Sequence, residues 1–275
     1  MHSIPRLTLN DGRAFPQLGL GVWQASNQEV AQAIDVALKA GYRAIDTAAI
    51  YENEEGVGRG IAAAQQARDT LFITTKLWNA DQGRDATLKA FDKSLARLGL
   101  DYVDLYLIHW PVPGKDRYVE TWRALVELRE QGRVRSIGVS NFTAQQLRRI
   151  IDESGVVPAV NQIELHPLMQ QQALRRFHVE HGIVTESWSP LSRGQALDDA
   201  TLKDLAQRYS KTPAQIVLRW HIQNGLMVIP KSVTPARIRE NANIFDFALD
   251  ETAMQAISRM NRDARIGPDP ETFGA

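Results

Sequence analysis

The chain has 275 residues, of which 44% are hydrophobic, so it can bury one large core. Lys plus Arg and Asp plus Glu each total 32, and this zero net charge gives no basis for binding nucleic acid or an anionic membrane surface. The chain has no cysteine, which excludes disulfides, a thiolate nucleophile and cysteine-bound metals. Neither a signal-peptide pattern nor an apolar run of about 18 residues is present, so we predict a cytoplasmic protein without a membrane segment.

Short apolar runs alternate with helical patterns along the whole chain. The chain starts with a predicted β-hairpin, because Leu7 and Leu9 precede the turn signal Asn10-Asp11-Gly12 and Phe15 follows it. Eight strands are then predicted from β-branched and apolar runs, near residues 18–22, 44–46, 71–75, 103–108, 134–139, 159–160, 183–185 and 227–229. Helical spacing predicts helices near residues 30–38, 54–65, 88–98, 122–126, 147–151, 170–181, 198–223 (two segments), 235 onward and 250–259.

Eight strand–helix units in succession predict a parallel sheet with right-handed crossovers. Such a sheet can close into a barrel or remain open and doubly wound. The strand ends favour the barrel, because all the carboxyl ends of a barrel open on one rim, where catalytic residues gather. Seven strands end in a polar or aromatic residue: Asp46, Lys76, His109, Asn141, Gln162, Trp188 and Lys231. The predicted fold is a (β/α)8 barrel of the α/β class, one domain over residues 1–275, with an N-terminal hairpin and extra C-terminal helices.

Four residues at this rim have the chemistry of an acid–base device. Tyr51 lies just beyond Asp46, but the ordinary pKa of tyrosine, about 10, is too high for ready proton donation at neutral pH. The charge of Lys76 could lower that pKa, and Asp46 could keep Lys76 protonated. His109 could hydrogen-bond a substrate carbonyl from the other side. Taken alone, Asp46 and Lys76 are more often a structural ion pair, and His109 is more often a hydrogen-bonded histidine at the rim. Taken together, the four residues predict a site that polarises a C=O group and protonates its oxygen.

The segments that carry these residues resemble the aldo-keto reductase family. Asp46, Tyr51, Lys76 and His109 occupy the positions of its catalytic tetrad in DTAAIYENEEGVG, ITTKLW and LYLIHWP. The resemblance covers essentially the whole chain, and PQLGLGVWQ, HPLMQQ, ESWSPLS and IGPDPETF are similar to bacterial 2,5-diketogluconate reductases, which also reduce methylglyoxal and β-keto esters. It implies that hydride passes from NADPH to the carbonyl carbon of a small aldehyde, ketone or dicarbonyl, while Tyr51 protonates the oxygen.

The resemblance also implies a cofactor site, since GVSNF, NQIELHP and IPKSVTPARIREN match the family's cofactor segments. Ser140, Asn141 and Gln162 would hold the nicotinamide amide, with Trp188 stacked on the ring. Arg237 would serve the adenosine 2′-phosphate, because its planar guanidinium can pair with phosphate and stack on adenine. On its own, the pattern of Arg237 and Glu240 suggests only a solvated helix face. The full predicted cofactor set is Ser140, Asn141, Gln162, Trp188, Ser189, Leu191, Lys231, Ser232, Val233, Thr234, Arg237, Glu240 and Asn241.

The predicted substrate-binding residues lie at or just past the rim strands: Trp23, Ile50, Trp78, His109 and Trp110. The loop after Trp188 and the C-terminal tail would complete this pocket, in a conformation that the sequence does not indicate. We predict a monomer and no metal site.

Two alternative functions remain open at the level of the sequence. One is a barrel aldolase with Lys76 as a Schiff-base lysine, although Asp46 disfavours it by keeping the lysine charged. The other is a non-catalytic NADPH-binding module.

Overall fold

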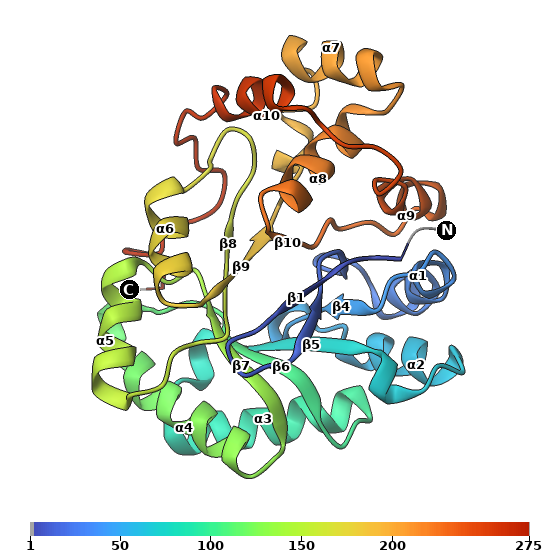
Figure 1. Cartoon of the computed structure of the whole chain (residues 1–275). Coiled ribbons are helices and arrows are strands. Elements are labelled where there is room, and N and C mark those ends of the chain that lie inside the picture. Colours follow the sequence, from blue (N-terminus) through green and yellow to red (C-terminus); the bar gives the residue numbers. More distant parts are fainter. Residues whose placement is uncertain (1–2, 275) are drawn as a thin grey trace.

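The computed structural model describes residues 3–274, which contain an eight-stranded parallel sheet closed into a barrel (Figure 1). The strands run in chain order around the barrel, and parallel bridges Leu18–Val228 and Gly21–Lys231 join the first strand to the last. The strands are β3 (Gly19–Gly21), β4 (Ala44–Asp46), β5 (Phe72–Leu77), β6 (Val103–Ile108), β7 (Val134–Ser140), β8 (Val160–Glu164), β9 (Val184–Trp188) and β10 (Met227–Val228). The barrel predicted from the sequence is confirmed.

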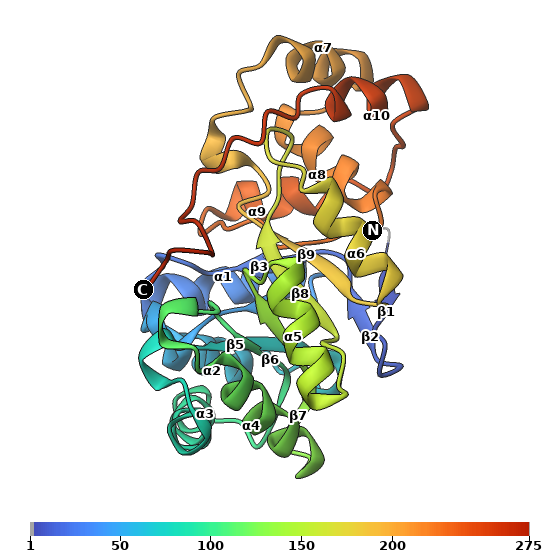
Figure 2. The ribbon, with the colours of Figure 1, turned by 90° about the vertical axis from the view of Figure 1, so that its left-hand side faces the viewer.

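Helices surround this barrel, and two of them, α7 and α10, lie farther out, as the two views show (Figures 1 and 2). No helix among the described residues has the length and apolar character needed to cross a bilayer. The helices are α1 (Asn27–Lys39), α2 (Glu54–Ala63), α3 (Arg84–Leu98), α4 (Tyr118–Glu130), α5 (Ala144–Ser154), α6 (Gln172–Glu180), α7 (Ala200–Tyr209), α8 (Pro213–Gln223), α9 (Pro235–Ala242) and α10 (Glu251–Ser258).

Local sequence signals explain where several helices begin, and backbone conformation decides two other helix boundaries. Ser26, Thr143 and Thr212 each form a capping box that satisfies backbone N–H groups at the start of α1, α5 and α8. Helix α6 begins at residue 172 rather than near 170 as predicted, because Gln171 adopts a left-handed conformation with φ of 45°. Helix α2 ends at residue 63, before the left-handed Gln65.

The interior of the barrel is apolar at the end opposite the rim. The predicted hairpin is confirmed as β1 (Arg6–Thr8) and β2 (Ala14–Pro16), and it lies across this end (Figure 1). Phe15 of the hairpin packs on Phe72 at the start of β5, with ring centroids 4.5 Å apart. Phe15 and Phe72 belong to an apolar cluster that also contains Leu9, Leu105 and Leu107, and this cluster packs the hairpin end of the barrel.

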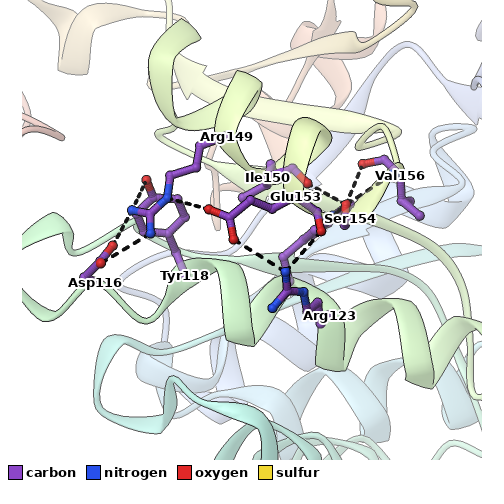
Figure 3. Close-up of polar contacts among 9 residues, drawn as sticks. Asp116, Tyr118, Arg123, Arg149, Ile150, Glu153, Ser154 and Val156 are labelled. Carbon is purple, nitrogen blue, oxygen red and sulfur yellow. Dashed lines mark hydrogen bonds and ion pairs between the residues drawn. The ribbon is translucent and has the colours of Figure 1, made fainter.

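A polar network ties the loop after β6 to α5 (Figure 3). Arg149 of α5 forms an ion pair with Asp116 and donates hydrogen bonds to Glu153 Oε1 (2.9 Å) and to Tyr118 Oη (3.2 Å). Arg123 of α4 contacts the same Glu153. The pairs are well exposed, so each contributes little on its own, but together they connect the loop after β6 to α5.

Candidate active site

A cavity of about 400 Å³ opens at the carboxyl ends of the strands. Its wall brings together most of the residues predicted from the sequence: Trp23, Asp46, Ile50, Tyr51, Trp78, His109, Trp110, Ser140, Asn141, Gln162, Trp188, Ser189 and Lys231. Trp23 and Ile50 are exposed hydrophobic residues at its mouth, as expected of a binding surface. The cavity therefore lies where the polar ring of strand ends was predicted to form a site.

Asp46 and Lys76 form a buried ion pair beneath this cavity. Lys76 is 0% exposed, and its Nζ donates to Asp46 Oδ1 (2.5 Å) and to the Thr47 carbonyl (2.8 Å). Gln162 Nε2 donates to the other Asp46 oxygen at 2.9 Å. Burial lowers the pKa of Lys76, but the charge and hydrogen bond of Asp46, together with the charges of Tyr51 and Glu186, outweigh burial and raise the pKa above the ordinary value. Lys76 is therefore held as an ammonium ion in a fixed position.

Tyr51 lies next to this pair and, like Asp46, lines the cavity. It closes a short 3₁₀ turn, Ala49–Tyr51, and the Lys76 Nζ lies 5.1 Å from the centroid of its ring. Burial raises the pKa of Tyr51, and the charge of Lys76 opposes that rise. The sequence-based prediction of a lowered pKa was wrong in its net direction, because it neglected burial. The lysine acts in the predicted sense but only limits the increase, so Tyr51 carries its proton at neutral pH.

His109 faces Tyr51 across the cavity, with ring centroids 5.7 Å apart in an edge-on arrangement. Burial, followed by the positive charge of Lys76, lowers the pKa of His109 well below its ordinary value. The imidazole is therefore neutral, and one of its nitrogens can donate a hydrogen bond without adding a second positive charge. Trp78 packs edge-on against the same ring at 5.3 Å.

Asn53 is a positioning residue that the sequence analysis missed. It is fully buried, and its Oδ1 accepts from Thr47 Oγ1 at 2.7 Å. Its Nδ2 donates to the carbonyls of Val22 (2.9 Å) and Ala25 (3.0 Å). One amide thus joins the segments that follow β3 and β4, from which Trp23 and Tyr51 reach the cavity.

The residues predicted to hold a nicotinamide are hydrogen-bonded to one another. Asn141 adopts a left-handed conformation (φ 65°), and its Oδ1 accepts from Trp188 Nε1 at 2.8 Å. Its Nδ2 donates to the His109 carbonyl and to Ser140 Oγ, both at 3.0 Å. These bonds fix the plane of the Trp188 indole at the cavity wall.

The predicted phosphate segment follows β10, next to the cavity. Lys231 lines the cavity, and Arg237 is exposed on α9 with no ion pair among residues 3–274. Glu240 Oε1 accepts a hydrogen bond from Thr212 Oγ1 (2.6 Å), which connects α9 to the start of α8. Four further predicted cofactor residues, Ser232, Val233, Thr234 and Asn241, lie in the same connection and helix but outside the cavity wall, as does Leu191 after β9.

Comparison with known proteins identifies the family. The model of the Aldo/keto reductase family matches residues 17–262. The chain belongs to the aldo/keto reductase family. It is 59% identical over 273 residues to the methylglyoxal reductase DkgA of Yersinia pestis, with 98% of each chain covered.

Two solved structures extend this similarity to three dimensions. An aldo/keto reductase from Brucella melitensis is 60% identical, with a TM-score of 0.91 over 94% of this chain and 100% of that one. A variant of the protein Gox0644, solved in complex with NADPH, is 52% identical, with a TM-score of 0.96 over the whole of both chains. The family, the fold and the oxidoreductase class predicted from the sequence are confirmed.

Further residues of this aldo/keto reductase line the cavity although the sequence analysis did not name them. Phe273 in the C-terminal tail packs on Trp110, with ring centroids 4.5 Å apart, and lies 6.5 Å from Trp78. Arg193, after β9, places its guanidinium 4.9 Å from the Trp23 ring centroid. Both come from segments without apolar periodicity, so only their general location could be expected. The other unnamed lining residues are Gly21, Val22, Gln24, Ile229 and Pro268.

A second buried acid, Glu186 of β9, lies beside the Asp46–Lys76 pair. Neither of its carboxyl oxygens has a hydrogen-bond partner within residues 3–274, since the neighbouring Gln162 amide donates to Asp46. Burial raises the pKa of Glu186 to about 8, and the negative charge of Asp46 contributes in the same direction. Glu186 is therefore mostly a neutral acid at neutral pH.

We expect Glu186→Gln to stabilise the protein more at about pH 9 than at about pH 5. The pKa of Glu186 is about 8 in the folded protein, above the ordinary 4.5. The wild type therefore has the stability that this difference contributes below pH 4.5, where Glu186 is protonated, and loses it as the pH rises through 8. Glutamine has a similar shape and cannot ionise, so the variant avoids that loss. Urea unfolding should show a stability difference that grows by on the order of several kcal/mol over this range. A stability difference between the variant and the wild type that does not depend on pH would contradict the raised pKa of Glu186.

Proposed function

We propose that this aldo/keto reductase uses NADPH to reduce small aldehydes, ketones and dicarbonyls, with Tyr51 as the general acid. The substrates we propose are methylglyoxal, 2,5-diketogluconate (to 2-keto-L-gulonate) and β-keto esters. The observation that carries the proposal is the buried Asp46–Lys76 pair beneath Tyr51 in the wall of the rim cavity. The cofactor is NADPH, in keeping with the family and with the NADPH complex of the 52% identical protein.

The residues of the chain fit this cofactor. Ser140 and Asn141, at the end of β7, and Gln162, within the neighbouring β8, offer polar groups for the nicotinamide amide. Trp188 offers a fixed aromatic face. Lys231 and Arg237 are exposed cations in the segment that would receive the 2′-phosphate. When bound, NADPH supplies the hydride that a carbonyl carbon accepts.

The tetrad would handle the proton of this reaction. Tyr51 would donate its hydroxyl proton to the carbonyl oxygen, which develops negative charge as the carbon is attacked. Lys76 would stabilise the phenolate that remains, because its ammonium is held close by Asp46. Neutral His109 would donate a hydrogen bond to the same oxygen and so orient the carbonyl.

The alternative of a Schiff-base aldolase has less support. A Schiff-base lysine must reach the substrate as a free amine. Lys76 is fully buried, its Nζ is bound to Asp46 and Thr47, and its pKa is raised. A non-catalytic binding module would not require a complete tetrad at the cavity. A monomeric state and a cytoplasmic location remain predictions.

A panel of carbonyl substrates with NADPH consumption as the readout tests the proposed function. We expect methylglyoxal, diketogluconate and β-keto esters to have kcat/KM values at least about tenfold above those of steroid ketones. The reason is that Trp78, Trp110 and Phe273 pack together on one wall, and forcing a bulky ligand into a packed site costs roughly 1–3 kcal/mol. A steroid among the best substrates would overturn the substrate assignment, and no turnover with any carbonyl would overturn the function.

A further inference from the structure

A buried carboxylate at the end of β8 holds the C-terminal tail. The side chain of Glu164 is 0% exposed. Its Oε1 accepts from the backbone N–H of Ile266 (2.7 Å), and its Oε2 accepts from that of Gly267 (2.9 Å). A buried carboxylate is costly unless its oxygens are satisfied, and here two backbone donors of a segment 102 and 103 residues away satisfy them.

The surroundings keep Glu164 ionised. His166 Nε2 lies 2.9 Å from Oε1, and because a carboxylate only accepts, this nitrogen carries the proton. The Arg265 guanidinium lies 4.0 Å from Oε2. Burial raises the pKa of Glu164, but the hydrogen bonds from His166, Ile266 and Gly267 outweigh it and lower the pKa overall. The contact between Glu164 and residues 266–267 is therefore a charge-assisted clasp, which we call the Glu164 clasp.

The clasped segment lies directly on Trp188. A Cβ atom at Gly267 would stand 2.3 Å from Cη2 of the Trp188 ring and 3.0 Å from Oε2 of Glu164, so only glycine fits between them. The Trp188 ring is thus supported by the tail and also by Asn141, which accepts its Nε1–H. A shift of the tail would remove one of these two supports.

The same tail continues into the substrate wall. Pro268 lines the cavity, and Phe273 packs on Trp110. The tail is anchored further back, where the N–H groups of Arg262 and Ala264 donate to the Leu168 carbonyl at 3.1 and 3.0 Å. The Glu164 clasp lies between that anchor and Phe273. There, a buried side chain of the barrel fixes the direction of the tail.

We propose that Glu164 is a positioning residue for both halves of the active site: its carboxylate holds residues 266–267 against Trp188 and thereby sets where Phe273 closes the substrate wall. This inference rests on the proposed function, in which Trp188 faces the nicotinamide and Phe273 faces the carbonyl substrate. The tetrad does not take part, so Glu164 governs binding and closure rather than proton transfer.

Glu164→Gln tests the clasp without requiring turnover. The glutamine amide offers one acceptor and would turn an NH₂ group toward a backbone N–H. We expect the amides of residues 266 and 267 to exchange hydrogen at least about tenfold faster, since a charge-assisted hydrogen bond is lost. Trp fluorescence should change as well. Glu54→Gln is the matched control, because Glu54 is also buried and bonded, to Thr75 and Arg97, but does not touch the tail. Unchanged exchange at 266–267 in Glu164→Gln, or equal acceleration in the control, would overturn the proposal.

Kinetics then test the link to Phe273. Glu164→Gln should raise KM for methylglyoxal by about tenfold and leave kcat within about threefold. If Glu164 acts through Phe273, the same change made in a Phe273→Ala background should add little, whereas full additivity of the two effects on KM would refute the link.

Gly267→Ala provides a second route if Glu164→Gln does not fold. It keeps the carboxylate but places a methyl group against both Cη2 of Trp188 and Oε2 of Glu164, so it disturbs the clasp from the side of the tail. Like Glu164→Gln, it should change Trp fluorescence and raise KM for methylglyoxal. A wild-type KM would count against the proposal. Exchange and fluorescence are measured without substrate, so an intact clasp in a protein that reduces no carbonyl would refute the proposed function alone.

Discussion

Replacing Lys76 with methionine should lower kcat for carbonyl reduction by about 10²–10⁴-fold and move the basic limb of the pH–rate profile upward. Burial raises the pKa of Tyr51, and Lys76 is the main group that opposes the rise. Without the ammonium, the pKa of Tyr51 rises further, so the tyrosine is a weaker acid and stays protonated to higher pH. Rates measured from about pH 5 to about pH 10 test this shift. An unchanged profile would show that Lys76 does not act on Tyr51.

The same variant should also be less stable, because Asp46 loses its partner. Removing one member of a buried ion pair typically costs about 3–5 kcal/mol. Burial already raises the pKa of Asp46, and the loss of Lys76 raises it further. Stability linked to a raised pKa is lost as the pH rises, so the deficit of the variant should be larger at about pH 8 than at about pH 5.

The double variant Asp46→Asn/Lys76→Met separates stability from catalysis. It removes both charges, so most of the stability lost in Lys76→Met should return, since replacing both buried partners is often nearly neutral. Its kcat should stay low, because Tyr51 still lacks the ammonium. Recovery of kcat together with stability would mean that Lys76 matters only for the fold.

Much of the fold could be predicted because the strands are short, apolar and bounded by polar residues. The run at residues 103–108 was predicted with the bounds that β6 has, since a strand buried on both faces reads as continuous apolar sequence. Helix ends were less predictable. Backbone conformation decides them, and the left-handed Gln65 and Gln171 carry no strong signal of their own.

The candidate site was predictable where residues follow strands and unpredictable where it depends on three-dimensional contacts. Asp46 ends β4, Lys76 is the last residue but one of β5, and His109 follows β6, so a barrel must bring them to one rim. Phe273 and Arg193 come from irregular segments whose course depends on contacts such as the Glu164 clasp. The raised pKa of Tyr51 also required the structure, because burial at a rim cannot be judged from sequence spacing.

Tyr51→Phe addresses the central claim, that Tyr51 protonates the carbonyl oxygen. The substitution removes the hydroxyl group and keeps the ring, so the packing against His109 and the contact with Lys76 should persist. The Asp46–Lys76 pair keeps its own hydrogen bonds, including the one to Thr47, so little loss of stability is expected. The residues proposed to hold NADPH are untouched. Only the proton donor is lost, and general acid catalysis contributes about 10²–10⁴-fold.

The most direct measurement is the single-turnover rate of NADPH oxidation by methylglyoxal, compared between wild type and Tyr51→Phe, with NADPH affinity determined in parallel from Trp fluorescence quenching. We expect the rate to fall by about 10²–10⁴-fold while the Kd for NADPH stays within about threefold of the wild type. A Tyr51→Phe rate within a few-fold of the wild type would contradict the assignment of Tyr51 as the acid.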